Sequence, residues 1–194
     1  MSVDNRYTSR YAKEYDKDRD FTGSVTFSGN TMTAGAGFTG GAGTVCATSV
    51  QRNGDIVTTQ FLIDLTDLYS STTDLDIIGV GTEPAYFGAI DAAVNGTVIG
   101  GSIRCLETPA GGITDIDIYS ATEGTGVFDG GIAALTETEL HTNGGAWSAA
   151  PETEVAFSAA FPADGQYLYL TGGAAGTAAK YTAGQFLITL IGHI

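Results

Sequence analysis

Residues 56–65 have the sequence IVTTQFLIDL and decide the fold class. Alternate positions in this stretch carry apolar or β-branched side chains, which is the period-two pattern of a strand with one buried face. The expected buried face consists of Val57, Thr59, Phe61, Ile63 and Leu65. Asn53-Gly54, just before the stretch, is a turn signal. The sequence therefore predicts a β domain that begins in this region.

Similar strand patterns recur through the rest of the chain. The predicted strands lie at residues 86–94, 97–106, 114–121, 154–160, 166–171 and 181–191. Asn95-Gly96 predicts a two-residue hairpin between the first two of them. A change of alternation near Gly184 predicts a bulge in the last one. Residues 132–140 (IAALTETEL) form the one predicted helix.

The composition agrees with a β fold that has many tight turns. The chain has 194 residues, of which 28 are glycine and only 4 are proline. The number and spacing of the strands predict an all-β fold, a jelly-roll-like two-sheet β-sandwich preceded by an extended N-terminal arm. We assign residues 1–50 to the arm and a β-hairpin or connector, and residues 51–194 to the sandwich domain.

Charge is distributed unevenly along the chain. Five of the eight basic residues lie in residues 1–20 together with five acids, and the acidic remainder accounts for the net charge of −14. Tyrosines recur there every four residues, which places them on one face of either a helix or an extended strand. We predict an arm that binds a partner through Arg6, Tyr7, Arg10, Tyr11 and Tyr15. A solvated tail is the alternative.

The acidic body argues against two classes of partner. Three basic residues outside the N-terminal segment cannot form the positive stripe that nucleic acid requires, and anionic lipid is disfavoured for the same reason. The sequence lacks an apolar run of about 18 residues, so it predicts no transmembrane span. The charged N-terminus also lacks the apolar core of a secretory signal. We therefore expect no nucleic acid and no membrane as partner.

Residues suited to catalysis are sparse. His141 and His193 are the only histidines, and the glycine-rich residues 35–43 lack the Lys-Ser/Thr of a phosphate loop. Cys46 and Cys105 lie far apart in strand-like contexts, which fits two buried thiols or, if the strands are neighbours, a disulfide. No zinc motif is present. We expect no enzyme activity, no cofactor and no metal.

Two features admit both a structural and a functional interpretation. Asp115 and Asp117 share one strand face, which could hold a hard cation such as Ca²⁺ or could simply be solvated. Trp147 could form a sugar-binding platform or could pack in the core. We expect the solvated face and the core position.

Four long stretches resemble a β-sandwich family of tailed-phage virion proteins, especially those of marine and cyanobacterial phages. They are FLIDLTDLYSSTTDLDIIG (61–79), IDAAVNGTVIGGSIRCLETPAGGITDIDIYSATEGTGVFD (90–129), ALTETEL (134–140) and ADGQYLYLTGGAAGTAAKYTAGQFLITLIGH (163–193). The segment before residue 50 lies outside the resemblance, and a shell-binding arm would vary with its shell.

The resemblance implies a capsid decoration (cement) protein with a jelly-roll body. It implies a homotrimer bound to the major capsid protein on the exterior of the virion, after synthesis in the host cytoplasm. The alternative is a phage head-fibre or tail-fibre module that binds host-surface glycans. A depolymerase or esterase is a third hypothesis.

Overall fold

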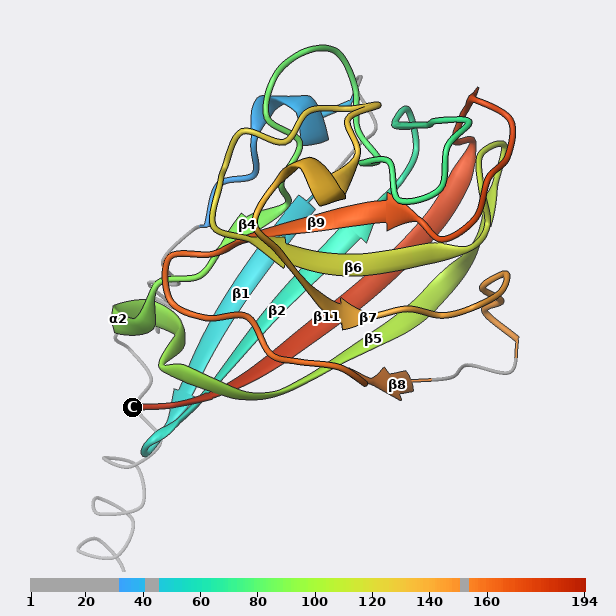
Figure 1. The fold of residues 1–194 in the computed structure, drawn as a ribbon. Coiled ribbons are helices and arrows are strands. Elements are labelled where there is room, and N and C mark those ends of the chain that lie inside the picture. Colours follow the sequence, from blue (N-terminus) through green and yellow to red (C-terminus); the bar gives the residue numbers. More distant parts are fainter. Residues whose placement is uncertain (1–31, 41–45, 151–153) are drawn as a thin grey trace, which may run out of the picture.

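The chain forms a sandwich of two antiparallel sheets in the computed structural model, which describes residues 32–40, 46–150 and 154–194 (Figure 1). One sheet has the order β1 (Cys46–Asn53), β2 (Ile56–Asp64), β11 (Ala183–His193), β5 (Thr97–Ala110) and β8 (Glu154–Ala156). The other has the order β4 (Gly88–Ala89), β9 (Tyr167–Gly172), β6 (Ile116–Ala121) and β7 (Glu137–His141). The predicted all-β sandwich is confirmed.

Short elements complete the described part of the chain. β3 (Tyr69–Ser70) and β10 (Ala179–Lys180) pair with each other outside the two main sheets. Three helical turns occur in the connections, η1 (Ala36–Phe38), α2 (Ala92–Asn95) and η2 (Ile132–Ala134).

The strands pair in a nested order. β2 pairs with β11, β4 with β9, β5 with β8 and β6 with β7, so each pair encloses the next along the chain. The first and third pairs belong to the five-stranded sheet, and the other two belong to the four-stranded sheet. Such nesting holds the two antiparallel sheets together as one sandwich.

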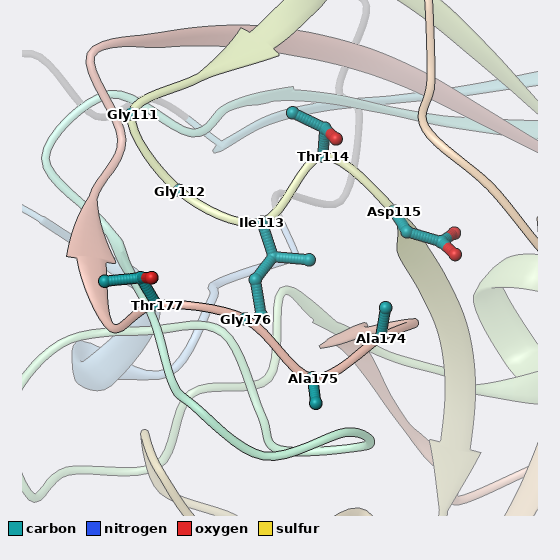
Figure 2. A pocket seen from close by; sticks show the side chains of 9 residues that line it. All are labelled: Gly111, Gly112, Ile113, Thr114, Asp115, Ala174, Ala175, Gly176 and Thr177. Atoms are coloured by element: carbon teal, nitrogen blue, oxygen red, sulfur yellow. The ribbon is translucent and has the colours of Figure 1, made fainter.

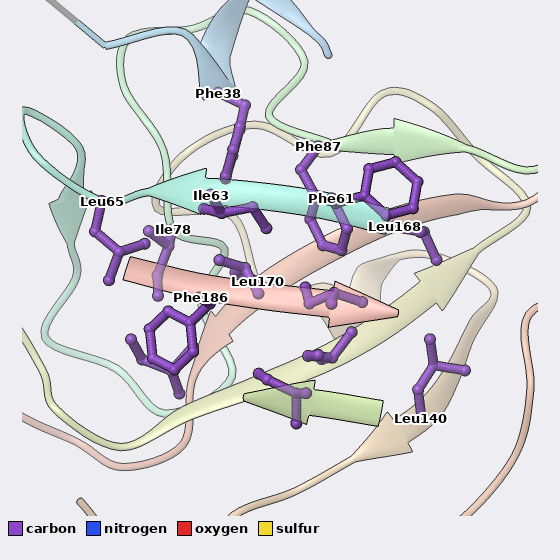
Figure 3. Packing of buried hydrophobic residues seen from close by; sticks show 14 of the residues in the cluster. Phe38, Phe61, Ile63, Leu65, Ile78, Phe87, Leu140, Leu168, Leu170 and Phe186 are labelled. Carbon is purple, nitrogen blue, oxygen red and sulfur yellow. The ribbon is translucent and has the colours of Figure 1, made fainter. Parts of the chain in front are cut away.

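Alternate side chains of β2 and the residue after it fill the space between the sheets. All five residues of the expected buried face are at most 1% exposed: Val57, Thr59, Phe61, Ile63 and Leu65. Phe61 packs edge-on against Phe87, with ring centroids 5.4 Å apart. Phe186 of β11 and Leu170 of β9 join the same cluster from the two sheets (Figure 3). The period-two pattern therefore identified the core side of this strand correctly.

A tight hairpin joins β1 to β2, as the Asn53-Gly54 signal predicts. Asn53 pairs with Ile56, and Gly54 has a φ of +63°, a left-handed conformation that glycine adopts at little cost. β1 begins at Cys46 and therefore crosses the expected boundary after residue 50. The predicted bulge is also present, since the pairing of β11 with β5 shifts register around Gly184.

The hairpin predicted at Asn95-Gly96 is wrong. The preceding residues form the two-residue strand β4 and then the helical turn α2, which is capped by the side chain of Asp91. Asn95 is 1% exposed, and its amide donates to Thr59 Oγ1 at 2.8 Å. The Asn95 side chain is thus used to bind β2, so the residue ends a helix and does not turn a hairpin.

The helix predicted for residues 132–140 is also wrong. Only η2 is helical, and the following residues form β7, which pairs with β6. β7 lies at the edge of the four-stranded sheet and places Leu140 in the core. Ladder hydrogen bonds and burial of Leu140 therefore override a weak local helix propensity.

Loops cover the outer face of the four-stranded sheet. A second cluster of buried residues forms there, in which Tyr119 of β6 and Tyr169 of β9 contact Ile77, Ala85 and Ile132 from the connections. Figure 1 shows these connections, with η2 among them, lying over β9 and β6. The outer face of the five-stranded sheet has no such cover within the described residues.

Candidate functional site

The central part of the outer face of β1, β2 and β11 is uncharged, and Asp64 of β2, His193 of β11 and Arg104 of the adjacent β5 lie around it on the same face. The ladder register places nine side chains on it: Ala47, Ser49 and Gln51 of β1, Thr58, Gln60 and Leu62 of β2, and Leu187, Thr189 and Ile191 of β11. None of them is ionisable, although the chain carries a net charge of −14. Leu62 is 39% exposed and Ile191 is 41% exposed. An acidic protein therefore presents a neutral and partly apolar flat surface.

A shallow groove crosses this neutral face. Its volume is about 390 Å³, and its lining includes Leu62, Leu106 and Leu187 from three strands. Leu62 lies directly opposite Ala47 on one side and Leu187 on the other. The apolar side chains thus form a row across the sheet. Such a row is suited to contact with apolar side chains of another protein.

β1 forms one edge of this sheet. It has eight residues and pairs with β2, and it has no strand on its other side in the described part of the chain. A strand edge exposes backbone donors and acceptors that can pair with an added strand. The neutral face and this edge together make a continuous surface for docking.

A cluster of acids lies on the opposite side of the sandwich. Asp115 immediately precedes β6, and Asp117 and Tyr119 lie on its outer side, while Glu139 is paired with Tyr119 from β7. Asp117 is only 4% exposed, and its Oδ1 accepts from Asn143 N at 2.8 Å. The expected solvated strand face is therefore wrong at Asp117, because loops that the sequence pattern cannot place cover this side of the sheet.

Burial makes these acids harder to ionise. It raises the pKa of Asp117 from 3.8 to about 6, and the nearby carboxylates of Asp115, Asp74 and Glu139 act in the same direction. Burial also raises the pKa of Asp115, against a backbone hydrogen bond from Gly145. The same causes raise the pKa of the Tyr119 hydroxyl to about 12. Several negative charges are therefore held close together at this end of the sheet.

An open pocket of about 330 Å³ adjoins the acidic cluster. Two loops line it, residues 111–115 before β6 and residues 174–177 after β9 (Figure 2). Figure 2 shows Asp115 at one end of the pocket, with Ala174 and Ala175 across from it. Most of the lining residues are small, so the pocket can admit water and small solutes.

The predicted contact residues of the arm lie outside the described residues. These are Arg6, Tyr7, Arg10, Tyr11 and Tyr15. Their role therefore stays a prediction. The neutral sheet face was not among the predicted sites. Leu62, Leu187 and Ile191 could have indicated it, since they are apolar residues at the outward positions of strands whose inward positions are already apolar.

The two histidines occupy different environments. His141 ends β7 and is 5% exposed, and burial lowers its pKa. Its Nδ1 lies 3.3 Å from Ser158 Oγ, but its Nε2 is buried without a partner. A serine–histidine pair in a catalytic triad has a third group that orients the histidine, and no such group bonds Nε2 here. His193 is exposed near the end of β11.

The remaining candidates lie in the core or, in the case of Cys46, pack against it half-buried. Cys46 and Cys105 are both free thiols, so the disulfide alternative is wrong, and burial raises the pKa of Cys46 to about 12. Trp147 is 5% exposed and its Nε1 donates to Ile116 O at 2.8 Å. The expected core position of Trp147 is confirmed.

No family model, curated protein or solved structure matches this chain. Across the described ranges, none of the helices has the length and apolar character needed to cross a bilayer.

Proposed function

We propose that this chain is a virion structural protein, a capsid decoration (cement) protein that binds and stabilises a shell of major capsid protein. The observation that carries the proposal is the uncharged central patch on the outer face of β1, β2 and β11 in an otherwise acidic chain. A charge-depleted patch with exposed leucine and isoleucine is typical of the centre of a protein–protein interface.

The two sides of the sandwich support a directed mode of attachment. Asp115, Asp117 and Glu139 lie on the side of the four-stranded sheet, and the neutral face lies on the other side of the sandwich. A decoration protein bound through the neutral face would turn its acidic side to solvent. The open edge of β1 would add backbone hydrogen bonds to a strand of the shell.

The sequence resemblance supplies the identity of the partner. Its stretches include the end of β2 from Phe61 onward and all of β11, the two strands that form the centre of the neutral face. A homotrimer on the capsid exterior, made in the host cytoplasm, remains part of the proposal. Residues 1–20 would add a second contact through their tyrosines and arginines.

Charging the neutral face should abolish attachment. In the double variant Leu62→Glu/Ile191→Glu, two carboxylates would have to be buried without partners in the interface, which we expect to weaken binding at least about 100-fold. Both side chains are about 40% exposed in the free protein, so the fold should tolerate the change. The measurement is co-sedimentation with undecorated shells of the virus that encodes the chain.

The matched control is Phe161→Glu. Phe161 is a similarly exposed apolar residue, at 43%, and lies in the connection between β8 and β9, outside both sheets. This variant should bind shells as the wild type does. Full binding by the double variant would contradict the assignment of the neutral face, and equal loss in the control would show that added negative charge alone prevents binding.

Removing residues 1–20 tests the predicted arm. We expect the truncated chain to bind shells more weakly and to keep the thermal unfolding midpoint of the intact chain, because residues 1–20 are densely charged and carry few apolar side chains that a core could bury. The measurements are the same co-sedimentation and a thermal melt by circular dichroism. Decoration as complete as that of the intact chain would show that the arm makes no essential contact.

The alternative function is a head-fibre or tail-fibre module that binds host glycans. The open pocket beside Asp115 is the observation that favours it. Imaging of labelled virions separates the two functions, since a decoration protein covers the head in many copies and a tail-fibre module appears in few copies at the tail. A glycan array probed with the intact chain tests the fibre function directly.

A further inference from the structure

Two carboxylates converge on one glycine at the acidic end of the four-stranded sheet. Asp115 Oδ1 and Asp117 Oδ1 lie 2.8 and 2.9 Å from the point that a Cβ would occupy on Gly173. Any side chain larger than hydrogen at position 173 would therefore meet both oxygens. The missing side chain of Gly173 thus lets two carboxylates approach the same stretch of backbone, beside the open pocket that Asp115 lines.

The hydroxyl of Thr171 is buried on the same outer face of the four-stranded sheet and has no hydrogen-bond partner. Thr171 is paired with Asp117 across the β6–β9 ladder, so the two side chains stand next to each other on the outer face. Thr171 is 0% exposed, and its Oγ1 makes no hydrogen bond. Asp115 Oδ1 is likewise buried and unpartnered. Since buried polar atoms are normally satisfied, these two oxygens indicate an ion or an ordered water at this position.

The charges around the site favour a cation over water alone. The charged groups that act on Asp117 are all carboxylates: Asp115, Asp74 and Glu139. Oxygen atoms of carboxylates and hydroxyls are the ligands that hard divalent cations prefer. In the ranges that the structure describes, no set of three His, Cys, Asp or Glu side chains has metal-binding geometry. The protein would thus supply two carboxylates and one neutral oxygen, and water from the pocket would supply the rest.

We propose that Asp115, Asp117 and Thr171 bind one hard divalent cation of the Ca²⁺ class next to Gly173. A site with two carboxylates and mostly neutral or water ligands is weak, so we expect a dissociation constant on the order of 10⁻⁴–10⁻³ M. The ion would tie the start of β6 to the end of β9. The site is on the other side of the sandwich from the neutral docking face, so the proposal is independent of capsid binding.

Isothermal titration of CaCl₂ into the chelator-treated full-length chain tests the site directly. We expect saturable binding of one ion per chain and, in 10 mM CaCl₂, a thermal midpoint about 2–5 °C higher than in NaCl of equal ionic strength. The NaCl comparison is needed because salt screens the repulsion in any strongly acidic chain. Absence of saturable binding, or an equal midpoint in the two salts, overturns the proposal.

Two substitutions assign the binding to these residues. Asp115→Asn removes one charge, and Thr171→Val removes the hydroxyl while keeping the branched shape. Each should weaken Ca²⁺ binding at least about 10-fold and remove the Ca²⁺-dependent rise of the midpoint. Glu83→Gln changes an exposed acid elsewhere and should leave both unchanged. If Asp115→Asn does not fold, Thr171→Val decides, and an affinity equal to that of the wild type in a folded variant refutes the site.

Discussion

Replacing Trp147 by alanine is expected to lower the free energy of unfolding by about 3–5 kcal/mol. The Trp147 ring packs edge-on against Phe186, with centroids 5.5 Å apart, and its Nε1 donates to the backbone oxygen of Ile116. The indole therefore joins β11 of one sheet to β6 of the other. Its removal would leave a cavity and a carbonyl without its donor. Because whole domains are stable by only about 5–15 kcal/mol, the loss is a large fraction of the total.

Chemical denaturation of the two proteins measures this loss, and Phe161→Ala is the control. Phe161 is 43% exposed, so its truncation should change stability by less than about 0.5 kcal/mol. A Trp147→Ala variant as stable as the wild type would contradict the core assignment. The result also affects the fibre alternative, because loss of glycan binding in a partly unfolded Trp147 variant would not show that the ring touches a sugar.

Replacing Asp117 by asparagine is expected to stabilise the protein above pH 7. The folded state holds the pKa of Asp117 at about 6, above its ordinary value of 3.8, mainly through burial. Between these two values the folded state retains a proton that the unfolded state has released, so stability falls as pH rises. The full shift corresponds to roughly 3 kcal/mol, and partial relaxation of the site would reduce it to about 1–3 kcal/mol.

Asparagine keeps an oxygen that can accept from Asn143 N, and it cannot ionise, so the gain should be present at pH 8 and vanish near pH 4. Urea denaturation at the two pH values, with EDTA present to exclude cations, measures the difference. Asp55→Asn is the control, since Asp55 is exposed in the β1–β2 hairpin, and it should change stability little at either pH. A variant less stable than the wild type at pH 8 would refute the unfavourable charge at position 117.

Local sequence patterns determined the fold class and one side of the core. Alternation in residues 56–65 identified the buried face of β2, and the change of alternation at Gly184 identified the bulge in β11. Both predictions succeed because a strand presents its side chains to opposite faces with a period of two, whatever lies beyond it. The sequence also shows apolar residues at outward positions of these two strands, namely Leu62, Leu187 and Ile191 of the neutral face.

Tertiary structure decided what the local signals could not. Asn95 bonds to Thr59, which is 36 residues away, and this contact replaced the predicted hairpin. Residues 137–141 became β7 because β6 supplied a ladder partner. Asp117 became buried because loops remote in sequence cover its sheet. The neutral face, likewise, exists only because β11, which is remote in the chain, lies beside the β1–β2 hairpin. Burial and pairing depend on which segments meet in space. The sequence alone therefore determined the fold class and the inner face of β2, and the packing of the sheets decided β7, the turn at Asn95 and the sites.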